Sequence, residues 1–157
     1  MLANLDKNIA QAGSLKELTA VYFENFLITS VSLKTRGNKE YFGTFLDGRL
    51  IETLESKVVI KTWQEIPSVY HNCSLGNFGF SPNEFTGILK IDVRLSDDNY
   101  FKYIPTIISR FKARSTRLLN QLHMTHSRVF WENSYTETPI ENLNDLSEVL
   151  NKISSHK

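Results

Sequence analysis

Two polar side chains, Glu84 and Thr86, follow a Ser-Pro-Asn corner at positions 81–83, near the middle of the chain. Proline has no amide proton to give to a sheet, so Pro82 ends one strand, and the chain re-enters the sheet at Glu84. Side chains at positions i and i+2 of a strand project from the same face. Such a pair on rigid backbone is a natural place for a site. The Glu84 carboxylate could ligate Mg²⁺ or Mn²⁺, but one carboxylate with Thr86 makes a poor cage for a hard cation, and a solvated or hydrogen-bonded glutamate is the favoured interpretation.

A second candidate site is a long segment that carries cations and no acids. From Asn99 to Trp131 there is no Asp or Glu. The candidate nucleic-acid-binding residues in it are Arg110, Lys112, Arg114, Arg117 and Arg128. Such side chains contact phosphates, and Tyr100, Phe101 and Tyr103 could stack on unpaired bases. A solvated helix face with aromatic residues in the core explains the same pattern, and both interpretations stay open at this point.

Three other reactive side chains favour structural roles. His123 and His126 lie three residues apart at a predicted helix end, but the sequence places no third ligand beside them, so we do not expect a metal there. Cys73 lies between Asn72 and Ser74 without a cationic neighbour, which favours a half-buried, unreactive thiol.

The elements that would position these residues can be read from apolar spacing and turn residues. Strands are predicted over 26–33, 69–80, 84–93 and 129–131, the last one extending towards Tyr135, and a hairpin is predicted around Asp47-Gly48. Helices are predicted over 54–66 after a Thr53 cap, over 103–122, and from a cap at Asn142 or Asn144. In the strand after the corner, Leu89 and Ile91 alternate with Lys90 and Asp92, which predicts one buried and one wet face.

The order of these elements predicts an α+β fold, a ferredoxin-like antiparallel sheet with helices packed on one face. In the longest helix the apolar stripe is predicted to contain Ile104, Ile107, Ile108, Phe111, Leu118 and Leu122. Residues 1–23 are expected to form an N-terminal extension, with a capped helical piece from Ser14, and residues 24–157 the domain.

Length and composition fit one globular domain in a reducing compartment. The chain has 157 residues, 41% of them hydrophobic, and a net charge of +1, which by itself says nothing about nucleic acid. Its single cysteine excludes an intrachain disulfide and a cysteine-built zinc cluster. No signal-peptide pattern opens the sequence and no apolar run is long enough to span a bilayer, so we expect a soluble cytoplasmic protein without a membrane partner.

Several short motifs, in order, resemble the single-tyrosine HUH transposases, most closely the REP-associated kind. They are Tyr41-Phe42-Gly43, Leu46-Asp47-Gly48-Arg49, Val59 to Trp63, Ser81-Pro82-Asn83, Gly87-Ile88-Leu89, Ile107 to Lys112, Val129 to Glu132 and Leu143 to Ile153. The resemblance covers roughly residues 24 to 155. It implies a ferredoxin-like domain of mobile elements that recognises hairpin or single-stranded DNA and cuts it with a tyrosine nucleophile and a divalent metal, Mg²⁺ or Mn²⁺.

The resemblance also implies which positions would carry the chemistry. Where the family has a His, bulky apolar, His motif after the Pro-Asn corner, this chain has Glu84, Phe85 and Thr86. Where the family has its nucleophilic tyrosine in the last helix, this chain has Lys152. Lysine cannot form a phosphotyrosyl intermediate, so we expect a degenerate HUH motif, no retained catalytic residue, no bound metal and no strand cleavage. Tyr135 could be named as a substitute nucleophile, but its place favours packing.

Three hypotheses follow. The leading one is a catalytically silent, transposase-like protein that binds hairpin or single-stranded DNA. The second is a structural or protein-interaction relic of a transposase without a role on DNA. The third, which we do not expect, is an active nuclease that depends on Glu84. A homodimer is compatible with the first two, and the sequence does not decide between a decaying remnant and a domain put to host use.

Overall fold

The computed structural model describes residues 22–95 and 103–155, and its centre is a four-stranded antiparallel sheet. The strands are β1 (Phe26–Lys34), β4 (Cys73–Ser81), β5 (Glu84–Asp92) and β6 (Thr136–Pro139), in the spatial order β4-β5-β1-β6. With α3 (Leu54–Gln64) after β1 and α5 (Tyr103–His123) after β5, this order is the βαββαβ arrangement of ferredoxin-like folds. The predicted α+β class is therefore confirmed.

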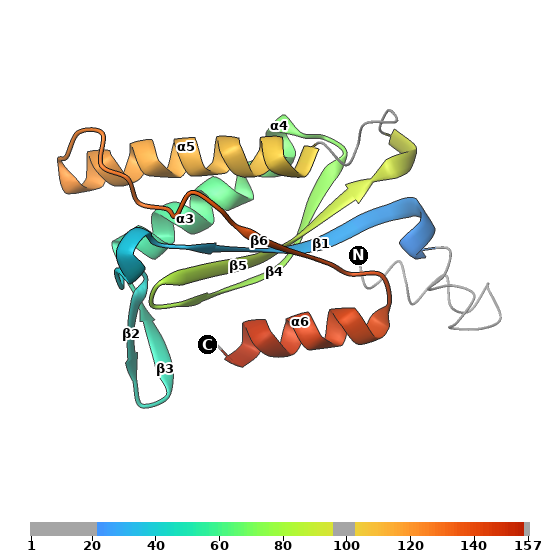
Figure 1. Ribbon diagram of the computed structural model, residues 1–157, viewed down its shortest axis with the longest axis horizontal. Coiled ribbons are helices and arrows are strands. Elements are labelled where there is room, and N and C mark those ends of the chain that lie inside the picture. Colours follow the sequence, from blue (N-terminus) through green and yellow to red (C-terminus); the bar gives the residue numbers. More distant parts are fainter. Residues whose placement is uncertain (1–21, 96–102, 156–157) are drawn as a thin grey trace.

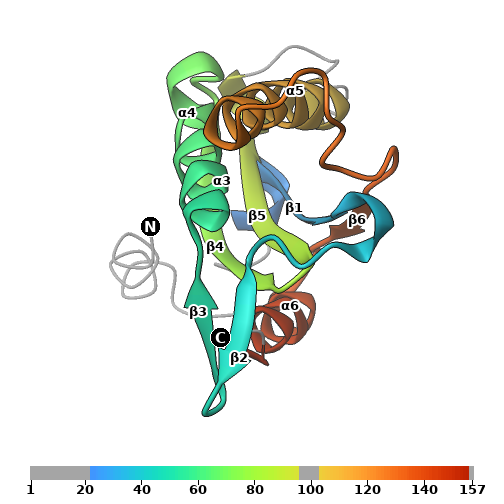
Figure 2. The same ribbon diagram turned by 90° about the vertical axis from the view of Figure 1, so that its left-hand side faces the viewer.

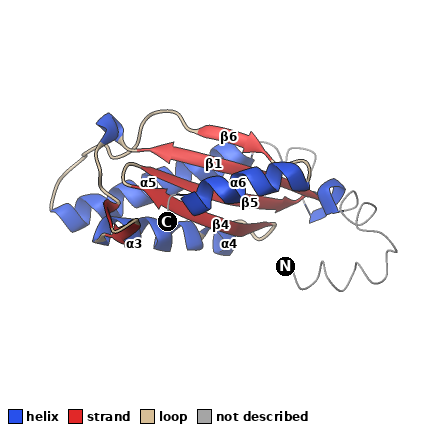
Figure 3. Ribbon diagram, turned by 90° about the horizontal axis from the view of Figure 1, so that it is seen from below, coloured by secondary structure: helices blue, strands red, loops and turns tan. Residues whose placement is uncertain are grey.

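Helices cover both faces of this sheet, whereas the sequence predicted helices on one face. Figure 1 shows α3 and α5 above the sheet and α6 (Leu143–Ser155) below it, and Figure 3 shows α6 lying across the lower face. The upper face holds a large cluster around Trp63, Phe85 and Phe111. The lower face holds a smaller one, in which Ile28 and Ile88 meet apolar side chains of α6. The one-face prediction was wrong because the apolar stripe of α6 needs the second face to be buried.

The central strand β5 is consequently buried on both sides. Lys90 was expected to be wet, but it is 8% exposed, and its ammonium lies 4.5 Å from the centre of the Phe26 ring. Burial lowers the pKa of Lys90. Apolar and polar residues do alternate in β5, but near Lys90 the segment around Phe26 covers the face that carries the polar residues.

The Pro-Asn corner joins β4 to β5 as predicted. Ser81 pairs with Glu84, so only Pro82 and Asn83 form the loop. The preceding strand begins at Cys73 and not at Val69, because residues Ile66–Val69 form the short helix α4, with Pro67 in its first turn. Two 3-10 turns, η1 (Arg36–Asn38) and η2 (Val93–Leu95), follow β1 and β5.

A separate hairpin of β2 (Gly43–Leu46) and β3 (Arg49–Glu52) projects away from the main sheet (Figure 2). Its turn residues Asp47 and Gly48 both have positive φ, 52° and 77°, as a tight two-residue hairpin turn requires. Thr53 then caps α3 as predicted, because its Oγ1 accepts a hydrogen bond from the Ser56 amide.

Two predictions about the second half of the chain need correction. Residues 129–131 form no strand, and Trp131 makes only an isolated bridge to Thr35, while β6 begins later, at Thr136. In the last turns of α5 the buried side of the helix differs from the predicted one. Leu119 is buried there, whereas Leu122, which was predicted to lie in the apolar stripe, is 37% exposed. The predicted stripe residues in the first part of the helix are buried, as expected: Ile104, Ile107, Ile108 and Phe111.

The predicted helical piece from Ser14 lies outside the described residues, except that a helical turn includes Tyr22. The side chains of Tyr22 and Phe23 pack against the lower cluster. The division at residues 23 and 24 stays a prediction.

Candidate functional site

Three side chains from distant parts of the chain meet on the lower face of the sheet. Ser32 Oγ and Thr86 Oγ1 are 2.9 Å apart, and Lys152 Nζ donates a hydrogen bond to Ser32 Oγ over 3.3 Å. Ser32 and Thr86 are buried, whereas Lys152 is an exposed residue. Two of the positions singled out in the sequence, Thr86 and Lys152, are thus neighbours through a serine that the sequence reading passed over.

Sheet register explains why these groups meet. Ser32 is paired directly with Thr86, and Lys34 with Glu84, so these four side chains lie on one face of adjacent strands. Polar Ser30 and Ser32 alternate with Val31 and Leu33 in β1. That alternation was the signal in the sequence that could have identified Ser32 as part of the site.

The helix α6 delivers Lys152 to this pair. Asn142 caps the helix, because its Oδ1 accepts a hydrogen bond from the Asp145 amide over 2.9 Å. Near its other end, α6 approaches β4 so closely that a Cβ on Gly79 would lie 3.0 Å from Ile153 Cγ2 and 3.1 Å from the Ile153 carbonyl oxygen. Glycine at position 79 therefore sets how near Lys152 comes to the sheet.

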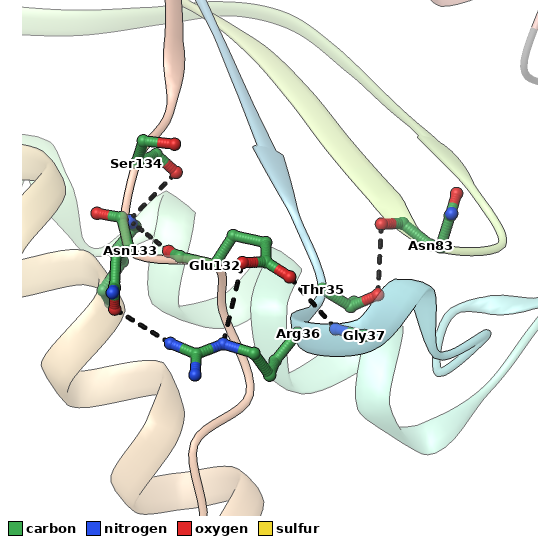
Figure 4. Close-up of polar contacts among 8 residues, drawn as sticks. Thr35, Arg36, Gly37, Asn83, Glu132, Asn133 and Ser134 are labelled. Atoms are coloured by element: carbon green, nitrogen blue, oxygen red, sulfur yellow. Dashed lines mark hydrogen bonds and ion pairs between the residues drawn. The ribbon is translucent and has the colours of Figure 1, made fainter.

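The corner before Glu84 is fixed by a polar network, drawn in Figure 4. The Thr35 amide and hydroxyl both donate to the Asn83 carbonyl oxygen, over 3.0 and 3.3 Å. Arg36 donates to Asn133 Oδ1 over 2.8 Å, and the Gly37 amide donates to Glu132 Oε1 over 3.0 Å. The turn after β1 is thereby tied to the corner and to residues 132–134, so the backbone leading into Glu84 is held from two sides.

The residues at this place do not fit the divalent metal that the resemblance implies. Glu84 supplies one carboxylate, Thr86 Oγ1 is already bonded to Ser32, and the Lys152 ammonium reaches the same hydroxyl pair. Mg²⁺ and Mn²⁺ require several oxygen ligands, and an ammonium within this cluster repels a dication. Across residues 22–95 and 103–155, no three His, Cys, Asp or Glu side chains gather closely enough to hold a metal ion.

The five predicted cations lie in different surroundings. Arg114 is bound by Glu65, the residue that follows α3 and caps its C-terminal end, with Nη2 donating to Oε1 over 3.3 Å and Nε donating to Oε2, and the hydrogen bond from Arg114 lowers the pKa of Glu65. A groove of about 370 Å³ beside this pair is lined by both residues, by Arg110 and by Tyr70. An arginine of the acid-free segment is therefore paired with a carboxylate at the junction of α3 and α4, a contact that the sequence could not show.

Lys112 points to the opposite side of α5. Its ammonium donates to the carbonyl oxygens of Glu132, Asn133 and Ser134 over 2.8, 3.2 and 3.4 Å, and burial lowers its pKa. Within the described part of the chain, the side chains of Arg110, Arg117 and Arg128 are exposed and make no hydrogen bond or ion pair. Of the five predicted cations, these three are therefore the most open to an external partner, although Arg110 also acts electrostatically on Glu65.

The remaining candidates have structural surroundings. His123 Nε2 lies 3.0 Å from Glu55 Oε1, and its ring packs against Tyr41 and Phe130, while His126 is exposed in the following loop. Burial raises the pKa of Cys73 to about 11.

The described aromatic candidates, Tyr135 and Tyr103, belong to the upper cluster. Tyr135 packs at the edge of the upper cluster, with its ring 5.8 Å from Lys112 Nζ. Of the aromatic residues proposed to stack on bases, Tyr103 packs against the upper cluster, and Tyr100 and Phe101 lie outside the described residues.

Comparison with known proteins supports the fold. No family model matches the chain, and no curated protein matches it. Among solved structures, it is similar to a REP-associated tyrosine transposase bound to a REP hairpin, with a TM-score of 0.58 and 11% sequence identity. The match covers 81% of this chain and 64% of the transposase, so the chain spans less than two thirds of that protein's length. No helix of the described residues could cross a membrane. The structural comparison places the described sheet and helices in the same fold as a transposase.

Proposed function

We propose that the protein binds hairpin or single-stranded DNA and does not cut it. The observation that carries this proposal is the likeness of its fold to a transposase bound to a REP hairpin, over 81% of the chain. The sequence resemblance points the same way from different information, since it rests on short motifs in order and not on backbone geometry. A degenerate HUH motif is part of this proposal.

Exposed arginines support a DNA partner. Arg110 and Arg117 lie on the outer side of α5, two turns of helix apart, and Arg128 lies in the loop that follows. Guanidinium groups bind phosphates in a bidentate geometry, and such contacts make binding strong and dependent on salt. Arg114 and Lys112 contribute less in this proposal, because Glu65 and three carbonyl oxygens already hold them.

The local chemistry at the corner supports the absence of cleavage. Strand transfer by a tyrosine requires that nucleophile and a polarised phosphate. Lys152 cannot supply the nucleophile, and Glu84 with Thr86 makes a poor cage for a metal, so we propose that no metal cofactor is bound. Tyr135 lies with Lys112 at the edge of the upper cluster, away from the Ser32–Thr86 pair on the lower face.

Fluorescence anisotropy with a labelled REP-like hairpin that carries a single-stranded extension tests the proposal. We expect the logarithm of the binding constant to fall linearly with the logarithm of salt concentration, by about 0.9 for each duplex phosphate contacted. Changing both Arg110 and Arg117 to Glu should abolish binding in a protein that still folds. Lys57→Glu, an exposed cation on α3, is the matched control and should change binding much less. Absence of salt-sensitive binding by the unaltered protein would refute the proposal.

Incubation of the same DNA with Mg²⁺ or Mn²⁺ tests the loss of cleavage. We expect intact DNA and no covalent protein–DNA adduct. Nicking that disappears in Glu84→Ala would instead establish the active nuclease.

A protein-contact role is the second candidate, and the β2–β3 hairpin favours it. Phe45, Leu46 and Ile51 are exposed on this projecting element, at 49%, 62% and 49%. Such apolar exposure on a two-stranded element is typical of a surface that another chain covers. A homodimer stays a prediction, which analytical sedimentation would test. A cytoplasmic location also stays a prediction. If changing Arg110 and Arg117 to Glu weakens none of the protein's binding interactions, the protein-contact role is favoured over DNA binding.

A further inference from the structure

A hollow of about 680 Å³ lies at the carboxyl end of α5, where the loop of residues 124–128 follows the helix. Figure 1 shows this end of α5 on the left, in the helix layer above the sheet. Arg117 and Gln121 of α5 line the hollow together with Met124 and His126 of the loop. Its volume falls within the roughly 300–1,000 Å³ that is typical of sites for small organic groups. The hollow is therefore large enough for a single nucleotide.

The loop that forms one wall of the hollow is held in a single conformation. The side chain of Asn120 is buried, and its Nδ2 donates to the Arg128 carbonyl oxygen over 3.0 Å. Its Oδ1 accepts from the Thr125 hydroxyl over 2.6 Å and from the Arg128 amide over 3.1 Å. Met124 and Ser127 both have positive φ, 56° and 55°. Residues with a Cβ keep this costly conformation only where the surrounding contacts fix it, so the loop is formed before any ligand arrives.

This rigid loop displays an apolar side chain to solvent. Met124 is 90% exposed, the largest exposed fraction among the large apolar side chains of the described residues. An apolar side chain in water contributes nothing to the stability of the isolated protein. Methionine packs well against the face and edge of an aromatic ring, and it is one of the side chains that wedge between nucleic-acid bases. Met124 is thus placed to contact a flat ring that enters the hollow.

The charges around the hollow favour an anionic ligand. Arg117 lines it, Arg128 follows its last lining residue in the chain, and both side chains are exposed. None of the described residues that line the hollow is Asp or Glu. The amide of Gln121 and the ring of His126 add hydrogen-bonding groups that suit the edge of a base. A nucleotide combines the flat ring and the negative charge that these side chains match.

We propose that this hollow binds an unpaired base of the DNA, with Met124 packed against the base and with Arg117 and Arg128 on the flanking phosphates. The inference rests on the DNA binding proposed above. It adds the element of the protein that distinguishes an unpaired strand from a duplex, since a base inside a duplex cannot enter the hollow.

The test compares two labelled hairpins with the same stem in the anisotropy titration. One carries a single-stranded extension, and the extension of the other consists of abasic sites, which keep the phosphates and lack the bases. We expect the unaltered protein to bind the hairpin with bases about tenfold more tightly, because contacts to one unpaired base contribute at least this much.

Variants at Met124 isolate the contact with the base. Met124→Ala should lower affinity for the extension with bases about fivefold and leave affinity for the abasic one unchanged. The salt dependence should not change, because no charge is removed. Met124→Leu should retain most of the preference. Leu143→Ala, which truncates an exposed apolar side chain of α6, is the matched control and should leave both affinities unchanged.

Arg117→Gln isolates the contact with the phosphate. It should weaken binding of both hairpins and reduce the salt dependence by about one phosphate contact, because the phosphates are present in both extensions. An unchanged salt dependence in this variant would overturn the assignment of Arg117 to this site.

Failure of this site is distinguishable from failure of the DNA proposal. If the unaltered protein binds neither hairpin, DNA binding is refuted and this site with it. If it binds both hairpins equally, the site is refuted and DNA binding stands. A preference for unpaired bases that persists in Met124→Ala also overturns the site. Because Met124 is almost fully exposed, its substitution should leave the melting temperature unchanged, so the variant reports binding and not folding.

Discussion

On both faces of the sheet a helix packs closely against a glycine, but the two faces differ in the size of their apolar clusters and in the polar side chains beside them. Each face contains a glycine against which a helix packs closely: Gly87 lies beneath Trp63 of α3, and Gly79 lies beneath Ile153 of α6. On the upper face, Phe85 is fully buried among the rings of Trp63, Phe78, Phe80 and Phe111. On the lower face the apolar cluster is smaller, and next to it lie Ser32 and Thr86.

This difference indicates where the fold can carry function. Loss of an interaction in the upper cluster removes many dispersion contacts at once, so that face chiefly determines stability. Within the described residues, the lower face is covered by α6 and by the segment around Tyr22 and Phe23, and the Lys152 ammonium and the Ser32–Thr86 pair lie beside this smaller cluster. A site at the edge of a thin cover can meet an external ligand without opening the main core.

The largest effect is expected for Gly87→Ala on the upper face. A Cβ there would lie 2.5 Å from Trp63 Cζ2, a distance that real Cβ contacts do not show, so the indole or the strand must move. We expect the free energy of unfolding to fall by about 3 kcal/mol, the upper part of the range for overpacked cores. Urea denaturation followed by tryptophan fluorescence measures it. An unchanged midpoint would mean that the upper face is loosely packed, against the comparison above.

A smaller effect on stability is expected for Gly79→Ala on the lower face. Its Cβ would meet Ile153 Cγ2 and the Ile153 carbonyl oxygen at 3.0 and 3.1 Å, so α6 can give way by a slight shift. We expect a loss of about 1 kcal/mol, because the shift also disturbs the hydrogen bond from Lys152 to Ser32. The same urea measurement applies. A loss of unfolding free energy as large as that of Gly87→Ala would show that the helices pack equally rigidly on both faces of the sheet.

The smallest effect is expected for Glu65→Gln, which breaks the ion pair that links α3 to α5 at the edge of the upper face. The hydrogen bond from Arg114 holds the pKa of Glu65 below its ordinary value of 4.5. A carboxyl with a depressed folded-state pKa stabilises the fold above the unfolded-state value, and this contribution is lost as pH falls through the folded-state value. The pair is partly exposed, so its contribution should be about 0.2–1 kcal/mol.

Thermal unfolding of the unaltered protein and of Glu65→Gln at several pH values measures this contribution. The difference in melting temperature should be at most about 3 °C at pH 7 and should vanish at acid pH. Gln64→Glu, which changes an exposed neighbour, serves as the control. A difference that persists below pH 3 would mean that Glu65 acts through packing and not through its charge.

Much of the fold was determined by local sequence. The Asp47-Gly48 turn, the Thr53 cap, the long helix from Tyr103 and the strand pair around Pro82 were predicted from residue types and spacing, and the structure confirms them. These features depend on interactions within a few residues, which a single sequence displays. The resemblance of the motifs to a transposase likewise agrees with the fold that the structural comparison supports.

Only the tertiary structure decided the partners of the site residues. The sequence could not show that α6 covers the second face, that Glu65 pairs with Arg114, or that Ser32 lies between Thr86 and Lys152, 120 residues away from the lysine. Such contacts depend on strand register and on which face each helix covers. The sequence thus singled out Glu84, Thr86 and Lys152 as residues of interest, and the structure decided that Thr86 and Lys152 both contact Ser32.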